Sequence, residues 1–101
     1  MKFRVGLALV LGLAAAGSAL AQDHPDGEAL SQACTSCHGL NGVSADAIPT
    51  IAGLPADDIV AKLVAFREQA ADATIMNRIA RGYTDDEIAA LADYFSQLSA
   101  P

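Results

Sequence analysis

The run Cys34-Thr35-Ser36-Cys37-His38 restricts the fold of this chain more than any other feature. Two thiols separated by two residues, with a histidine directly after them, are typical of the site where a c-type haem is attached. Each thiol adds across one vinyl group of the haem, so the two sulfur atoms must lie on one side of a helical turn. The chain contains two cysteines in all. We therefore predict that Cys34 and Cys37 attach one haem and that His38 binds its iron.

Two other chemistries use the same cysteine spacing. A redox-active disulfide of the thioredoxin kind normally follows a strand in a βαβ unit, and the sequence has no such pattern. A structural zinc ion needs four ligands, and a second cysteine pair is missing. A haem-free redox or zinc module is therefore the less favoured interpretation.

The first 21 residues have the pattern of an export signal. Lys2 and Arg4 form a positive start, residues 5–16 are apolar, and the small residues that follow end in Ala19-Leu20-Ala21. We predict a cleaved signal peptide over residues 1–21, a haem domain over residues 22–101, and a location in the periplasm. The alternative is an uncleaved membrane anchor, since the uncharged run is close to the shortest length that spans a membrane.

The predicted mature chain is small and acidic. It keeps four basic and twelve acidic residues, a formal charge of −8. We expect no nucleic-acid partner, because phosphate binding needs a basic surface. The charge suits a basic protein partner, and it equally serves solubility. A chain of about 80 residues builds a thin core, which a covalently held haem would complete.

The hydrophobic pattern predicts four short helices and no strand. The first begins near Asp26 and runs into the cysteine pair, the second covers residues 55–69, and the third covers residues 74–81 with Gly82 as its stop. The last follows Thr84-Asp85-Asp86-Glu87, which has the pattern of a capping box. We therefore expect an all-α domain of about four short helices wrapped around one haem.

Apolar residues predict how these helices pack. We expect Gly27 and Ala33 to permit a close crossing of the first and last helices. Two sets of apolar residues recur at helical spacing, and they are Ile59, Leu63 and Phe66 in the second helix and Ile88, Leu91, Phe95 and Leu98 in the last. Tyr94 lies at the edge of the last set, and with Leu91 and Phe95 it is our candidate for the other side of the crossing. Residues 39–55 read as a loop that still carries apolar side chains, so we expect it to cover a haem face.

The sixth ligand of the iron has two candidates in the predicted mature chain. Met76 is its single methionine, and it follows a long amphipathic helix that can carry the chain to the far side of the ring. Methionines are more often core residues than ligands, but in a haem protein a lone thioether favours ligation. His24, beside Pro25, is better explained as a solvated histidine. We predict His38 and Met76 as the axial pair.

Histidine–methionine ligation favours an electron carrier over a catalyst. Both axial positions are filled, and the thioether stabilises Fe(II). The alternative from another class is a haem enzyme or sensor whose distal position is open, which requires that Met76 does not bind the iron.

The chain resembles the class I cytochromes c in CTSCHG, IPTIAGLP, the methionine segment and the capped last helix. Within that class, the stretches IPTIAGLPADDIVAKLVAF and TIMNRIARGYTDDEIAALADYF resemble the cytochrome subunits of flavocytochrome c sulfide dehydrogenases. Those subunits are known in one-haem and two-haem forms, and a single CxxCH motif corresponds to the one-haem form.

The resemblance implies roles for individual residues. It implies that Cys34 and Cys37 form thioethers, that His38 is the proximal ligand, and that Met76 is the distal ligand. Pro49 matches the proline whose carbonyl accepts a hydrogen bond from the proximal histidine, although a plain turn proline is the alternative. Further candidates near the haem are Tyr83 and, for its propionates, Arg67, Arg78 and Arg81.

The resemblance also implies a function. The protein would be a non-catalytic, one-electron carrier with haem c that accepts electrons from a flavoprotein subunit oxidising sulfide and passes them to a downstream cytochrome. The alternative is a free-standing, diffusible cytochrome c of a respiratory or photosynthetic chain.

Overall fold

A computed structural model describes residues 2, 6, 12, 24–72 and 75–100. The predicted signal peptide falls on residues 1–21, which lie outside the described residues apart from three isolated positions. The elements in chain order are α1 (Gly27–His38), the 3₁₀ helix η1 (Leu40–Gly42), α2 (Ala56–Arg67), α3 (Met76–Ala80) and α4 (Asp85–Ser96). These residues contain helices and no strand, which confirms the predicted all-α class. Within the described ranges, no helix has the length and apolar character needed to cross a bilayer.

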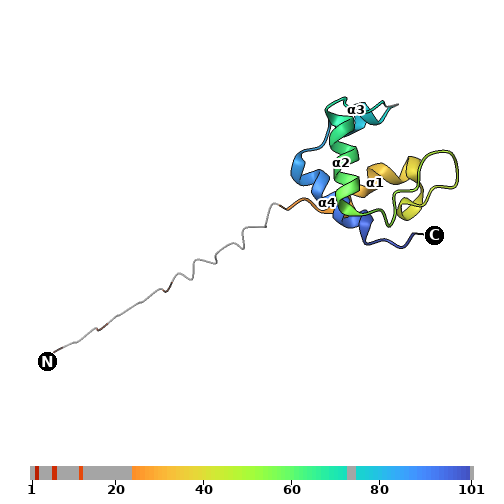
Figure 1. Ribbon diagram of the computed structural model, residues 1–101. Helices are drawn as coiled ribbons and strands as arrows, with labels where there is room; N and C mark the ends of the chain where they lie inside the picture. Colours follow the sequence, from red (N-terminus) through yellow and green to blue (C-terminus); the bar gives the residue numbers. More distant parts are fainter. Residues whose placement is uncertain (1, 3–5, 7–11, 13–23, 73–74, 101) are drawn as a thin grey trace.

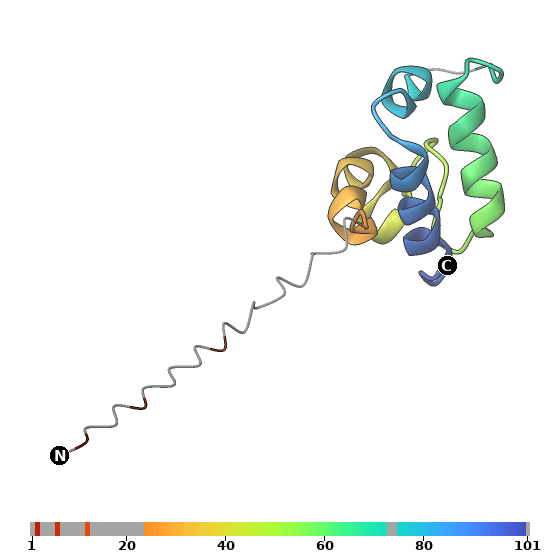
Figure 2. The same cartoon turned by 90° about the vertical axis from the view of Figure 1, so that its left-hand side faces the viewer.

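Helix α4 lies at the centre of the domain. It packs against α1 on one side and α2 on the other, while α3 packs against α2. Figure 1 labels the helices, and the view in Figure 2, turned by 90°, shows α4 between α1 and α2. The three longer helices thus form the body of the domain. Helix α3 lies near the C-terminal end of α2, and the loop 43–55 leads into its N-terminal end.

Local chemistry sets the helix ends. The carboxylate of Asp26 accepts hydrogen bonds from the backbone N–H groups of Glu28 and Ala29 and so caps α1. Thr84 and Glu87 form the predicted capping box at the start of α4, with each side chain accepting from the other residue's backbone N–H. Helix α2 begins at Ala56, one residue later than predicted, because Pro55 takes the extended N-cap conformation.

The buried core is small and belongs mainly to α4. Ile88, Leu91, Ala92 and Phe95 of α4 are buried, and Ile59 of α2 packs against three of them. The ring of Tyr94 meets the ring of Phe95 edge-on, with ring centroids 5.4 Å apart. The predicted apolar positions of the last helix therefore face its neighbours.

The crossing of α1 and α4 depends on Gly27. A Cβ atom added there would collide with the carbonyl oxygen of Ala90 and lie 2.9 Å from Cβ of Tyr94. Ala33, the second small residue predicted at this crossing, is exposed and faces the cavity described below. Ser31, one turn after Gly27, is buried instead, and its hydroxyl donates to the carbonyl of Glu28 at 2.6 Å.

We expect Gly27→Ala to lower the free energy of unfolding by about 1–3 kcal/mol, since a methyl group forces α1 and α4 apart. Gly82→Ala is the matched control, because the nearest atom to an added Cβ there is the Ile79 carbonyl oxygen at 3.4 Å. The control should change stability by no more than about 0.5 kcal/mol. Guanidinium unfolding of the haem-loaded proteins measures both values, and equal stabilities would contradict the close crossing.

Candidate haem-binding site

One apolar cavity brings together residues from every helix longer than one turn. It has a volume of about 520 Å³, within the range of small-molecule and cofactor sites. Its wall includes the last turns of α1, the loop 47–51, the inner face of α2, the start of α3, and Leu91 and Phe95 of α4. The cavity therefore lies where the polypeptide core is incomplete.

The cysteine–histidine motif forms one edge of this cavity. Cys34, Cys37 and His38 occupy the last two turns of α1, and all three line the cavity. Burial raises the pKa of the Cys34 thiol, whereas Cys37 is exposed. Helix α1 must end directly after His38, because Gly39 has φ +89° and an added Cβ atom would collide with the carbonyl of Val43.

Pro49 orients the ring of His38. The Nδ1 atom of His38 lies 2.6 Å from the carbonyl oxygen of Pro49. A carbonyl oxygen can only accept a hydrogen bond, so Nδ1 carries the hydrogen and Nε2 keeps a free lone pair. This is the tautomer that binds a metal through Nε2, with its orientation fixed by the second hydrogen bond.

Met76 lines the same cavity as His38, from a different element. It is the first residue of α3 and is half-buried. Ile75 and Ile79 flank it on the cavity wall, and they are 63% and 36% exposed. Both side chains therefore expose apolar surface at the cavity wall. A flat apolar cofactor bound in the cavity would cover that surface. His24, the weaker ligand candidate, is exposed and does not line the cavity.

The remaining walls are apolar, as the sequence pattern predicts. The loop contributes Ile48 and Ile51, and α2 contributes Ile59, Leu63 and Phe66. Tyr83 also lines the cavity. Burial raises the pKa of its hydroxyl, and the negative charge of Glu87 acts in the same direction. The hydroxyl therefore stays protonated and neutral beside the cofactor site.

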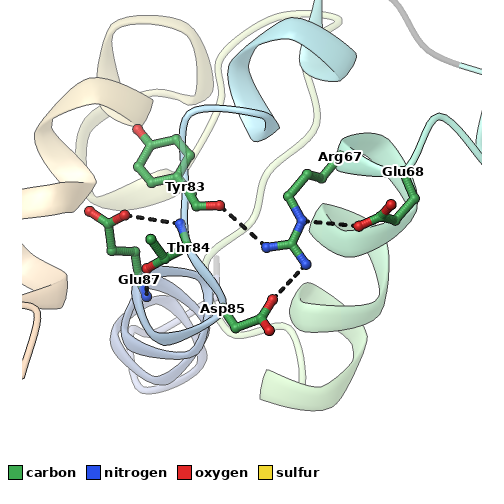
Figure 3. A network of polar contacts seen from close by, with 6 residues as sticks. All are labelled: Arg67, Glu68, Tyr83, Thr84, Asp85 and Glu87. Atoms are coloured by element: carbon green, nitrogen blue, oxygen red, sulfur yellow. Dashed lines mark hydrogen bonds and ion pairs between the residues drawn. The ribbon is translucent and has the colours of Figure 1, made fainter.

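The three arginines predicted near the propionates do not line the cavity. Arg67 instead donates to Asp85 at 2.5 Å, to Glu68 at 3.3 Å and to the carbonyl of Tyr83 at 3.3 Å (Figure 3). Arg78 and Arg81 are exposed on and after α3. The three arginines therefore lie outside the cavity wall, and their contact with the propionates stays a prediction.

Lys62 is the long cationic side chain that does line the cavity, and the carboxylate residue Asp72 lines it as well. The sequence contained a signal for Lys62, since it interrupts the apolar positions Ile59, Leu63 and Phe66 at helical spacing. A lysine on the apolar face of a helix can extend its stem over an apolar surface and place its charge at the rim. In the haem-loaded protein, its ammonium group would be the cation on the cavity wall that can pair with a haem carboxylate.

The residues fit a covalently bound haem. The cavity offers two thiols at the required spacing, an imidazole with a free Nε2, a thioether, and apolar walls. Within the described part of the chain, no cluster of three or more His, Cys, Asp or Glu side chains suits a metal ion held by protein ligands alone. The donor set suits iron in a porphyrin, which supplies the remaining four nitrogen ligands.

The chain belongs to the cytochrome c family, because residues 14–99 match the family model described as cytochrome c. Among curated proteins, it is 42% identical over 73 residues to the cytochrome subunit of sulfide dehydrogenase of Chlorobaculum tepidum, which is 72% of this chain and 66% of that protein. It is 33% identical to cytochrome c-553 of Desulfomicrobium norvegicum and to cytochrome c-553 of Nitratidesulfovibrio vulgaris. The alignments cover 66% and 90% of this chain, respectively, and 88% of each c-553.

Family membership confirms the predicted cofactor and class of function. The protein carries covalent haem c on its CxxC-spaced cysteines, Cys34 and Cys37, and it is an electron-transfer protein rather than an enzyme. The chain spans just under two thirds of the length of the sulfide dehydrogenase subunit that it matches.

We expect Lys62→Gln to lower the reduction potential. Reduction removes one positive charge from the iron, so a nearby cation favours Fe(II). If the ammonium and the iron were separated by about 10 Å, an effective dielectric of about 40–80 would give an interaction of about 0.4–0.8 kcal/mol, or about 20–35 mV for one electron. Spectroelectrochemical titration measures the shift, which should shrink at high salt. Arg78→Gln removes the same charge away from the cavity wall, and an equal shift in both variants would contradict a specific role for Lys62.

Proposed function

We propose that this protein is a periplasmic one-electron carrier that serves as the cytochrome subunit or electron-accepting partner of a flavin-dependent sulfide dehydrogenase. The observation that carries the proposal is the likeness to the Chlorobaculum tepidum subunit, which covers most of the predicted mature chain. The signal pattern of residues 1–21 supports export, with residues 22–101 as the cytochrome c domain.

The proposal includes an axial pair formed by His38 and Met76. Three observations support it: both side chains line one cavity, Nδ1 of His38 is engaged by Pro49 so that Nε2 is available, and Met76 is the one thioether on the wall within the described residues. Thioether ligation stabilises the reduced state relative to a second imidazole. The pair therefore suits an acceptor of relatively high potential.

The polypeptide contributes positioning and insulation. Bound haem supplies a one-electron Fe(III)/Fe(II) couple. The Pro49 carbonyl fixes the imidazole plane, and the isoleucines of the loop and of α3 exclude water from the iron. Because the hydrogen bond to Pro49 and the surrounding apolar side chains hold the imidazole in place, a change of one electron would require little rearrangement. The cavity wall includes exposed side chains such as Ile48 and Ile75, so an edge of the bound haem would be within reach of a redox partner.

In the proposed pathway, oxidation of sulfide at the partner's flavin releases two electrons, which leave one at a time through this protein. The acidic mature chain favours a partner that presents a basic docking surface. A downstream cytochrome would then accept each electron.

A second candidate is a free-standing diffusible cytochrome c. It is favoured by the two c-553 relatives, because this chain covers 88% of each of them but 66% of the sulfide dehydrogenase subunit. The two candidates share the haem site and differ in whether a flavoprotein accompanies the protein.

We expect Met76→His to lower the reduction potential by on the order of 100–300 mV, because axial ligands tune haem potentials over about 0.8 V. The Fe(III)–thioether band in the far red should disappear at the same time. His24→Gln is the control and should leave the band and the potential unchanged. A far-red band that persists in Met76→His, or in Met76→Ala, would exclude Met76 as the ligand.

Gentle purification distinguishes the two functions. In the proposed complex, flavin absorbance co-elutes with the haem on size exclusion at low ionic strength, and added sulfide reduces the haem in that fraction. We expect about 0.5 M salt to separate the two, since screening weakens charged docking surfaces. Elution of the haem protein alone at low salt, with no reduction by sulfide, would instead support the free carrier.

A further inference from the structure

Arg67 joins the two ends of the segment that carries Met76. It is the last residue of α2, and the partner of its Nη2 atom, Asp85, is the first residue of α4. The 17 residues between them, 68–84, include α3 and Met76. Figure 3 shows the guanidinium group lying between the end of α2 and the start of α4. We call Arg67, Asp85 and the carbonyl of Tyr83 the Arg67 clamp.

The clamp uses the geometry of the guanidinium group. Nη2 donates to Asp85 at 2.5 Å and Nη1 donates to the Tyr83 carbonyl at 3.3 Å, so two nitrogens hold two acceptors on the chain that enters α4. Nε donates to Glu68 on the near side. The side chain of Arg67 is 20% exposed, although that of Asp85 is 85% exposed. A lysine ammonium cannot reproduce this planar fork.

The two residues that Arg67 binds, Tyr83 and Asp85, lie at the start of α4, and Tyr83 also lines the haem site. Tyr83 and Asp85 flank Thr84, whose N–H donates to Glu87 at 2.9 Å in the capping box of α4. The carbonyl of Tyr83 faces Arg67, whereas its ring extends away from Arg67 and lines the cavity. A substitution of Arg67 can therefore affect the cavity wall through Tyr83 alone, without any other residue between them.

The segment between the clamped ends has few other anchors among the described residues. Helix α3 packs mainly against α2, Ala80 is the one buried residue among the described positions of 68–84, and Ile75 and Ile79 are exposed. Local opening costs least where buried contacts are few. Closing the base of the segment restricts how far Met76 can move from its place on the cavity wall, by reducing the freedom of the chain that carries it.

We propose that Arg67 is a positioning residue for Met76: by joining the end of α2 to the start of α4, it limits how far α3 and Met76 can move from the cavity wall and so resists displacement of the thioether from the iron. The inference rests on the proposed ligation by Met76. An exposed ion pair contributes little to global stability. The effect of the clamp therefore lies in local opening rather than in unfolding.

Imidazole is a suitable probe because it competes with a thioether for ferric iron. The experiment titrates ferric, haem-loaded protein with imidazole and follows the loss of the far-red thioether band. We expect Arg67→Gln to bind imidazole about fivefold or more tightly than wild type, a size typical of coupling between linked equilibria. Asp85→Asn should act in the same direction but less, because the contact with the Tyr83 carbonyl remains. Arg67→Lys should fall between wild type and Arg67→Gln.

Arg78→Gln is the matched control. It removes the same charge and lies only two residues from Met76, but Arg78 makes no ion pair within the described residues. It should bind imidazole within about twofold of wild type. Combining Arg67→Gln with Asp85→Asn should add little to Arg67→Gln alone, since both remove one interaction. Raising the ionic strength should tighten imidazole binding to wild type and leave Arg67→Gln nearly unchanged.

The outcomes separate the two proposals. A wild-type protein that lacks the thioether band overturns the ligation by Met76 and, with it, the role of Arg67. A wild-type protein that has the band, together with Arg67→Gln and Asp85→Asn variants that match Arg78→Gln in imidazole affinity, overturns the clamp alone. If Arg67→Gln does not fold, Asp85→Asn still decides, because its substitution lies on an exposed side chain.

Discussion

The structure depends on the burial of one apolar ring system in a core that the polypeptide leaves incomplete. Seven hydrophobic residues are buried among those described, and four of them belong to α4. The side chains that would extend this core, such as Ile48 and Ile75, remain exposed at the cavity wall. A covalently held haem gives them a surface to pack on, and at roughly 25 cal/mol per Å² of apolar area this burial is a major stabilising contribution in so small a domain. The bound haem is therefore part of the hydrophobic core of this fold.

The features that could be predicted from the sequence are those that depend on residues close together along the chain. The cysteine spacing, the capping box at Thr84 and the apolar spacing of the last helix each act within one or two helical turns, and α1, α4 and the cavity wall follow them. The confirmed all-α class rests on such local signals. The position of Ile48 and Ile51 on the cavity wall could also be predicted, because apolar residues in a glycine- and proline-rich loop need an apolar surface to cover.

Tertiary geometry decides the rest. Ala33 and Ser31 lie two positions apart on α1, and only the crossing angle with α4 determines that Ser31 is buried and Ala33 faces the cavity. The partners of the arginines depend on the same tertiary geometry. Arg67 ends the helix whose apolar face lines the site, but the start of α4 passes close enough to bind its guanidinium group. Lys62 occupies the cavity wall about one and a half turns earlier. Its position among the apolar residues of the helix was a local signal, but no local pattern states that the start of α4 passes beside Arg67.

The placement of charge connects these observations to electron transfer. The mature chain is strongly acidic, yet the two cations on α2 have separate tasks: Lys62 lies at the cavity wall, and Arg67 is bound by backbone and carboxylate oxygens away from it. A charge near the iron changes the potential, whereas a charge held in a fork of hydrogen bonds fixes the chain that it joins. The same helix can therefore adjust the energy of the transferred electron and the geometry of the methionine segment through different residues. Substitutions at one of these positions leave the other contribution intact, because the two side chains share no partner.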